Sequence, residues 1–186
     1  MGYKEAEAGR STMLGIFAAL FCVWAVIRIT SCVTYDRDIG GHLKRAGDAN
    51  SVKLAASELK IAIDNIDKWG LCPDVKEVTD PENLPGSCYT SILYKTPSED
   101  IAFWRFNLQE AHADLLRLPE DADTLMKSNT LMKLRETLLD NGEKGVRVTN
   151  PDGISIYPRN GIYLWFGLLS ALSALVILGY KVWHDW

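Results

Sequence analysis

The sequence predicts an all-α membrane protein in which two transmembrane helices flank a helical extramembrane domain that carries one small β-hairpin. Three patterns in the 186 residues predict it: an apolar block near each end, a polar middle with apolar residues at helical spacing, and a short alternating stretch before the second block. The expected order is a tail at 1–12, a transmembrane helix at 13–34, an extramembrane domain at 35–160, a second transmembrane helix at 161–183 and a tail at 184–186.

The first apolar block runs from Met13 to Val33 and contains a single charge, Arg28. Its length suits a span, because about 20 helical residues cross the hydrocarbon core of a bilayer. Arg28 lies one to two turns from the end of the block, so its side chain can snorkel to the interface, and an intramembrane contact with an ion or a partner is the alternative. The apolar stretch is longer than the core of a cleavable signal peptide. The sequence before Cys32 resembles a lipobox, but the charge of Arg28 disfavours lipidation there.

The second block, Ile162 to Val182, has no charge as far as Tyr180. Amphipathic rings at both ends of a span are typical of the two headgroup levels of a bilayer. The rings in question are Tyr157, Tyr163 and Trp165 at one end, and Tyr180, Trp183 and Trp186 at the other.

Both blocks carry small residues at helical spacing, which in lipid allow two helix backbones to approach closely. The stripe of the first block is Gly15, Ala18, Ala19 and Cys22, and that of the second is Gly167, Ser170, Ala171 and Ala174. Either the two helices pack on each other within one chain, or one stripe is an oligomer interface. Two stripes allow both.

The middle of the chain begins with two expected helices. The first covers 35–49, with Ile39, Leu43 and Ala46 on one side and a bend at Gly40–Gly41. The second runs from a cap at residue 50 or 51 to Trp69 and ends at Gly70. Its apolar residues repeat at steps of three and four, as on one face of a helix: Val52, Ala55, Leu59, Ile63, Ile66 and Trp69.

Two further helices and the hairpin complete the domain. Thr96-Pro97-Ser98-Glu99 fits a capping box that starts a helix ending near Leu118, and Pro119 starts another that ends at a cap formed by Asn141–Gly142. The hairpin is expected at 146–157, around a type I turn at 150–153. The aromatic residues of the helix after Thr96 belong either to the core or to a surface for a partner, and the residues singled out for that surface are Trp104, Phe103 and Phe106.

Cys72 and Cys88 bracket a segment rich in Pro and Gly and form a possible disulfide, which would suit an oxidising compartment. With two spans, both tails lie on one side. We therefore expect the tails in the cytoplasm and the domain at 35–160 outside a bacterial-type inner or plasma membrane. The charge rule decides little, because so long a loop translocates largely regardless of its charge.

No catalytic, metal or cofactor motif stands out, so the sequence predicts no enzyme, no cofactor and no metal site. Phosphate-binding G-x-x-x-x-G-K-S/T, G-x-S-x-G and C-x-x-C patterns do not occur. His42, His112 and His184 lie far apart, and the acidic run at 120–123 lacks the other ligands of a calcium loop. The middle of the chain has 21 acidic and 16 basic residues, which argues against nucleic acid as a partner.

These patterns favour a protein that acts by contact, as a structural or accessory subunit whose partners are membrane lipid, itself or other membrane proteins. The layout of tail, span, helical domain and span resembles the input half of bacterial chemoreceptors and sensor kinases. That resemblance implies the alternative, a two-span sensor that binds a ligand or partner outside and signals through its spans. A less favoured alternative is an oligomeric channel with Arg28 near the pore mouth, because neither block has a polar stripe wide enough for a wet pore.

Overall fold

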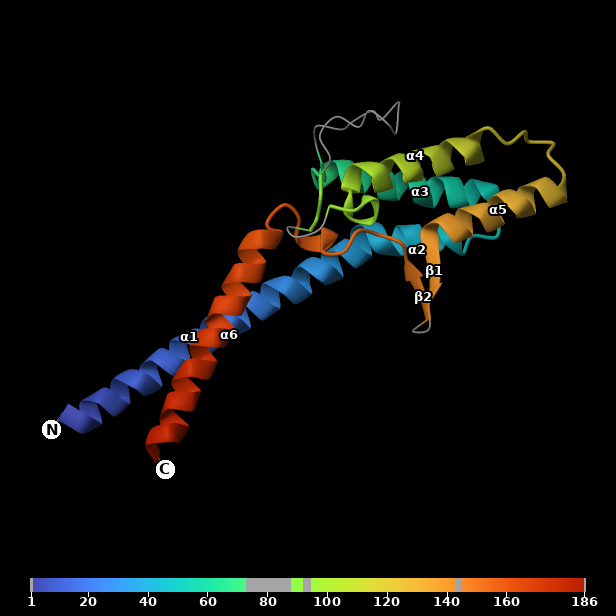
Figure 1. Cartoon of the computed structure of the whole chain (residues 1–186). Coiled ribbons are helices and arrows are strands. Elements are labelled where there is room, and N and C mark those ends of the chain that lie inside the picture. Colours follow the sequence, from blue (N-terminus) through green and yellow to red (C-terminus); the bar gives the residue numbers. More distant parts are fainter. Residues whose placement is uncertain (1, 73–87, 92–94, 143–144, 186) are drawn as a thin grey trace. The chain divides into compact units, whose positions relative to one another are not determined.

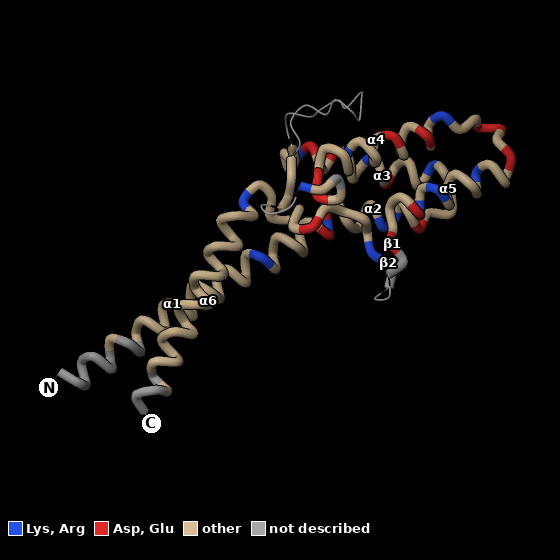
Figure 2. Tube along the Cα trace, viewed as in Figure 1, with Lys and Arg blue, Asp and Glu red and all other residues tan. Residues whose placement is uncertain are grey.

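The chain is mostly helical and divides into two compact units (Figure 1). The computed structural model describes residues 2–72, 88–91, 95–142 and 145–185. Unit 1 consists of Met1–Cys32 with Arg159–Trp186, and unit 2 consists of Val33–Pro158. Among the residues coloured by charge in Figure 2, most charged ones lie on unit 2, and Arg28 is the one charge in the apolar block at 13–33.

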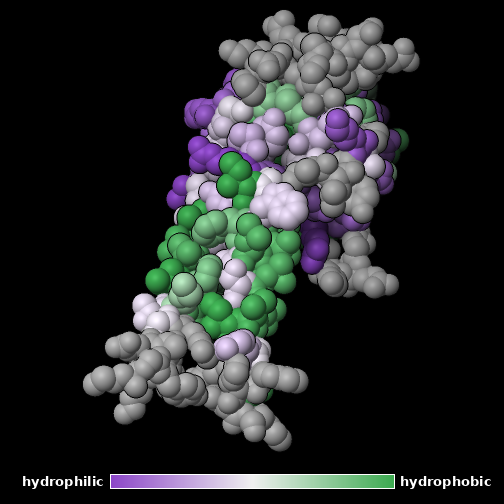
Figure 3. Space-filling model, turned by 60° about the vertical axis from the view of Figure 1, so that its left-hand side comes forward, coloured by the Kyte–Doolittle hydropathy of each residue, from purple (hydrophilic) through white to green (hydrophobic). Residues whose placement is uncertain are grey.

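Unit 1 is a pair of crossing helices, α1 (Gly2–Tyr35) and α6 (Asn160–Asp185). Both contain a stretch that is long and apolar enough to cross a membrane. In the most apolar window of each helix, 0% of the α1 residues and 11% of the α6 residues are buried. The core helix of a soluble protein would be largely buried instead. Hydrophobic side chains accordingly cover the visible face of this pair (Figure 3).

Unit 2 begins at Val33 in the last turn of α1, which is followed by a π-helix at Asp36–Gly40 and then by α2 at Gly41–Gly47. The wider turn is defined by the backbone N–H of Gly41, which donates to the carbonyl of Asp36 five residues earlier. A Cβ on Gly41 would lie 2.9 Å from that carbonyl oxygen, so this turn requires a glycine. The predicted helix at 35–49 is confirmed, and the expected bend at the two glycines takes the form of this π-turn.

The core of unit 2 lies where α2 packs on α3 (Val52–Lys68), and α3 on α4 (Ile101–Leu116). The helix α5 (Thr124–Leu138) packs mainly against α2. The periodic apolar positions predicted for the first two helices point inward, and the largest fully buried side chains include Ile39, Leu43, Leu59, Ile66, Ile101, Leu108, Leu138 and Ile154.

The boundaries predicted for α3 are confirmed. The side chain of Ser51 accepts a hydrogen bond from the backbone N–H of Leu54, which satisfies a donor at the first turn. The helix reaches its C-cap at Trp69, and Gly70 follows with a φ of +63°, a conformation that glycine adopts without strain.

The helix expected from Thr96 starts later than its capping box indicates. Pro97–Glu99 forms a single 3-10 turn, and the cap of α4 is Asp100, whose carboxylate accepts from the N–H of Ala102 at 2.9 Å. Backbone pairing explains the shift, because the N–H of Thr90 donates to Glu99 and the N–H of Ile101 donates to Cys88. These extended contacts hold the chain out of the α-helix until residue 100.

The helix predicted from Pro119 to Asn141 is too long at both ends. Asp123 accepts from the N–H of Met126 at 2.6 Å, so α5 begins at Thr124. Its last residue is Leu138, because the next four residues form strand β1. The expected cap at Asn141–Gly142 was therefore wrong, and those residues belong to the strand.

The hairpin predicted at 146–157 is displaced by one strand. Strand β1 (Leu139–Gly142) pairs antiparallel with β2 (Gly145–Val148) in the register Leu139↔Val148. Ile154–Ile156 forms a 3-10 turn rather than a strand, with Ile154 buried in the core. One alternating pair of isoleucines is too short a pattern to distinguish a strand from a single helical turn.

Candidate functional site

The small-residue stripe of α6 faces α1 within unit 1. Gly167 is buried, and a Cβ placed on it would lie 2.8 Å from the Trp24 ring, so only glycine lets the indole lie against the α6 backbone. The indole N–H of Trp24 donates to the carbonyl of Tyr163 at 2.8 Å. Ser170 is also buried, and its hydroxyl donates to the carbonyl of Gly167 at 3.0 Å. Ala171 and Ala174 are half-buried.

The small-residue stripe of α1 lies on the side of α1 opposite to Trp24. Gly15, Ala18, Ala19 and Cys22 are all exposed, and no described atom lies within 4 Å of a Cβ placed on Gly15. At about 100° per residue these four positions cluster on one side, and Trp24 lies about 180° from Gly15. The two stripes predicted from sequence thus do not meet each other. One is used within the chain and the other is open.

Arg28 lies on the same side of α1 as Trp24, one helical turn further along the chain. The residue is half-buried, and its Nη1 atom is fully buried without a hydrogen-bond partner among the described residues. The apolar blocks at 13–33 and 162–180 contain no Asp or Glu that could neutralise it.

The surface predicted around Trp104 is mostly core. Trp104 is 7% exposed, and its indole N–H donates to the carbonyl of Thr149 at 2.8 Å. The ring thereby joins α4 to the residue that follows β2, and it offers no surface to a partner. Phe103 and Phe106 are half-buried beside it. The aromatic spacing predicted the apolar face of α4 correctly, and the inference of a partner surface was wrong for Trp104.

The structure contains a disulfide between Cys72 and Cys88, with 5.8 Å between their Cα atoms. It links the end of α3 to the segment that precedes α4, where the carbonyl of Cys88 accepts from the N–H of Ile101. Residues 73–87, which the disulfide encloses, lie outside the described residues.

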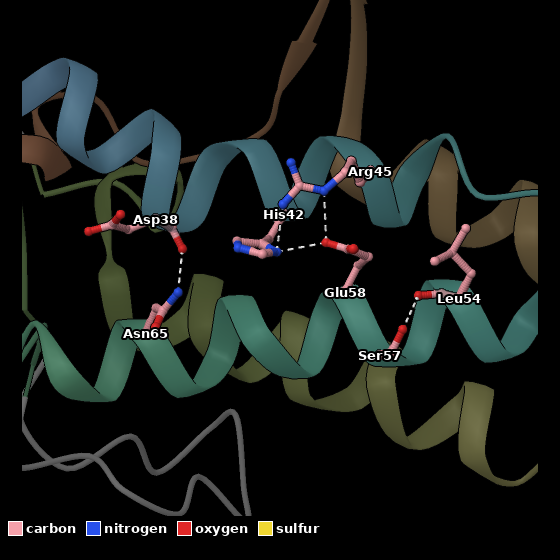
Figure 4. A network of polar contacts seen from close by, with 7 residues as sticks. All are labelled: Asp38, His42, Arg45, Leu54, Ser57, Glu58 and Asn65. Carbon is pink, nitrogen blue, oxygen red and sulfur yellow. Dashed lines mark hydrogen bonds and ion pairs between the residues drawn. The ribbon is translucent and has the colours of Figure 1, made fainter.

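A polar network fastens α2 and the π-helix to α3 (Figure 4). The amide of Asn65 donates to the carbonyl of Asp38 at 2.6 Å. Glu58 accepts from Arg45 at 2.9 Å and lies 2.6 Å from the Nδ1 of His42. Burial would raise the pKa of Glu58, but the hydrogen bonds from His42 and Arg45 outweigh it and hold that pKa below its usual value.

The contacts of this network join α2 and the π-helix to α3. Within α3, the hydroxyl of Ser57 also donates to the carbonyl of Leu54. Within the described ranges no three His, Cys, Asp or Glu side chains come together as a metal site. Part of the acidic run at 120–123 instead serves α5, since Asp123 is its cap.

An open groove of about 1010 Å³ lies in unit 2 between the start of α3, the end of α4 and α5. Its lining is mixed rather than of one charge. Arg135 pairs with Asp48 at 3.5 Å, the ammonium of Lys127 donates to the carbonyl of Glu120, and Met132 is 58% exposed on the groove.

Comparison with known proteins identifies no relative: no family model, no curated protein and no solved structure matches the chain.

Proposed function

We propose that this chain is an integral membrane protein that acts by contact, as a structural or accessory subunit of a homo-oligomeric or larger membrane assembly. The observation that carries the proposal is the open stripe on α1. Of the two stripes, that of α6 is occupied by Trp24, while Gly15, Ala18, Ala19 and Cys22 remain exposed.

Inside a bilayer, a stripe of small residues can support the association of two helices. Apolar burial does not drive association inside a bilayer, because the lipid tails are as apolar as leucine. Close packing does, and small residues let a second helix approach until its backbone makes many short-range contacts. On α1 this face of glycine and alanine lies beside the large exposed side chains of Ile16 and Val23, and its small side chains let a second helix approach closely.

The disulfide supports the orientation in which unit 2 lies outside the cytoplasm. Disulfides persist in oxidising compartments and are rare where thiols are kept reduced. With two membrane spans, an outer unit 2 places both tails in the cytoplasm of a bacterial-type inner or plasma membrane.

Three matched glycine variants test the proposal. Gly15→Leu adds bulk to the open stripe, Gly167→Leu adds it against Trp24, and Gly179→Leu adds it where no described atom lies within 4 Å and no stripe runs. We expect Gly15→Leu to reduce the native size of the particle extracted in mild detergent while leaving the melting temperature of the chain unchanged.

The other two variants distinguish a loss of assembly from a loss of stability of the α1–α6 pair. Gly167→Leu should lower the stability of the α1–α6 pair first, since the ring of Trp24 cannot yield as a flexible side chain would. Gly179→Leu should behave as the wild type. If Gly15→Leu left particle size and composition unchanged, the proposal would be wrong.

The groove of unit 2 favours one second candidate, a sensor whose outer unit binds a small ligand. A ligand that fills the groove should raise the melting temperature of the full chain, and Met132→Trp, which narrows the groove, should abolish that rise. A rise that persists in Met132→Trp would place the ligand elsewhere.

A further inference from the structure

Arg28 is the one charge within the apolar block of α1, and its surroundings do not neutralise it. An ionised side chain inside a membrane is costly unless it pairs with an opposite charge or reaches the interface. The nearest carboxylate along the helix is that of Asp36, which at 1.5 Å per residue lies about 12 Å away.

The geometry of the helix makes the interface difficult to reach. Side chains on an α-helix tilt toward its amino end, and for Arg28 this direction leads away from unit 2 and toward the middle of the span. The end of the block at Val33 is about 8 Å from Arg28 along the axis. The Nη1 atom of Arg28 is covered by other atoms of the chain, and among the described residues it has no hydrogen-bond partner.

The partner helix α6 offers no countercharge. Trp24 donates to the carbonyl of Tyr163, and the two helices run in opposite directions, so the residues level with Arg28, four positions further along α1, are Arg159 and Asn160. An amide can accept a hydrogen bond but cannot neutralise a guanidinium. The positive charge therefore remains at the seam of the helix pair, where Arg28 is only half-buried.

We propose that Arg28 binds an aspartate or glutamate on a transmembrane helix of a different protein, at the depth of Arg28. This rests on the proposed function and specifies the partner: a membrane protein with a carboxylate about five residues inside its span. A carboxylate matches the fork of the guanidinium with two parallel hydrogen bonds, and their strength rises where water is excluded.

A second copy of this chain does not supply that group. Neither apolar block contains Asp or Glu, so a copy in the same orientation presents no carboxylate at this depth and adds a second Arg28 there. A lipid phosphate is the other anion within a membrane, but phosphates lie beyond the hydrocarbon layer. The tilt of the side chain toward the amino end of α1 favours the deeper carboxylate.

A synthetic helix tests the proposal without knowledge of the natural partner. The full chain, with a donor fluorophore at its amino terminus, is reconstituted in phosphatidylcholine vesicles with a leucine-rich host helix of about 21 residues that carries an acceptor. One host has Glu five residues inside the end nearer to unit 2, and the matched host has Gln there. Energy transfer measures association.

We expect the Glu host to bind wild type about tenfold more tightly than the Gln host, in the range known for polar contacts between membrane helices. Arg28→Gln should bind both hosts equally. Arg28→Lys should keep part of the preference, which shows that a loss in Arg28→Gln is not a folding defect. Asp36→Asn and Asn160→Ala should keep all of it.

Two outcomes overturn the proposal. One is equal binding of the Glu and Gln hosts by wild type, or a preference that survives in Arg28→Gln. The other is a preference for the Glu host that disappears when part of the phosphatidylcholine is replaced by phosphatidylglycerol. If the protein also retains phosphatidylglycerol only when Arg28 is present, the ligand of Arg28 is a lipid phosphate. Neither outcome depends on Gly15, so the proposed function stands or fails separately by the effect of Gly15→Leu on native size.

Discussion

At the scale of single residues, three glycines that look alike in the sequence have different physical roles. Gly41 permits a π-turn, Gly167 permits contact with Trp24, and Gly15 leaves a surface open. In a helix interior glycine costs about 1 kcal/mol relative to alanine. Close contacts within the chain account for Gly41 and Gly167, whereas a Cβ placed on Gly15 would have no described neighbour within 4 Å. Only the neighbours in space distinguish a backbone requirement, a packing requirement and an interface.

The first residue-scale prediction concerns Gly41. Gly41→Ala should lower the free energy of unfolding by about 1–3 kcal/mol, although alanine is the better helix former, because its Cβ would lie 2.9 Å from the Asp36 carbonyl oxygen. Thermal unfolding of the full chain in mild detergent measures the change. Lys44→Ala, at an exposed position of α2, is the control and should change stability little. A more stable Gly41→Ala would show that the π-turn relaxes readily to an α-helix.

The second residue-scale prediction concerns pH. Burial lowers the pKa of His112, and the nearby Lys60 lowers it further, against smaller opposing effects of Ala56 and Asp64. The unfolded chain takes up this proton near pH 6.5, whereas the folded chain resists it until a lower pH. The stabilising contribution is therefore complete above about pH 6.5 and is lost as the pH falls toward the folded pKa.

His112→Gln should remove this part of the pH dependence. Unfolding measured from about pH 7.5 to 5.0 should show a smaller loss of stability in His112→Gln than in wild type. Equal slopes in the two proteins would show that other groups carry the acid sensitivity.

At the scale of elements, the sequence predicts the bounds of a helix well where its local signals agree. The helix α3 has a serine cap, six apolar residues in phase and a glycine stop, and all three agree with the structure. The start of α4 has two competing caps, Thr96 and Asp100, and backbone pairing with Cys88 and Thr90 decides between them. Such long-range pairing is not visible in the local sequence.

The two errors around β1 have the same origin. Residues 139–142 continue the apolar and polar pattern of α5, so nothing local ends the helix at Leu138. Strand pairing with Gly145–Val148 ends it, because Leu139 finds its partner in Val148 across the hairpin. Likewise, both small-residue stripes are visible in the sequence. Which of them packs within the chain depends on Trp24, a residue that belongs to neither stripe.

The element-scale prediction concerns the disulfide that joins α3 to the segment before α4. Its cysteines are 16 residues apart, so removing it should cost about 3 kcal/mol of unfolding free energy through the entropy of the unfolded chain. The double variant Cys72→Ser, Cys88→Ser measures this by thermal unfolding. The wild type under reducing conditions should match the variant. Unchanged stability in both would show that the helices alone order this region.

At the scale of the whole molecule, the two units differ in how much of their apolar surface is buried. Unit 2 has a closed core, a disulfide and a polar network. Unit 1 has hardly any core, and its helices expose large apolar residues along their length, which a bilayer or another helix must cover. The proposed contact function therefore belongs to unit 1: the open stripe on one side of α1 and Arg28 on the other.

The most direct measurement of the central claim asks what covers the open stripe in the native membrane. A photo-crosslinking maleimide is attached to Cys22 in a Cys32→Ser background, and in a control to a cysteine introduced by Val23→Cys with Cys22→Ser. The two sites are at the same depth, but they are about 100° apart around the helix.

We predict a discrete crosslinked protein from Cys22, either a second copy or another membrane protein, and lipid adducts alone from position 23. Lipid adducts alone from both positions would contradict the account, because the stripe of Gly15, Ala18, Ala19 and Cys22 would then face the bilayer and not a partner.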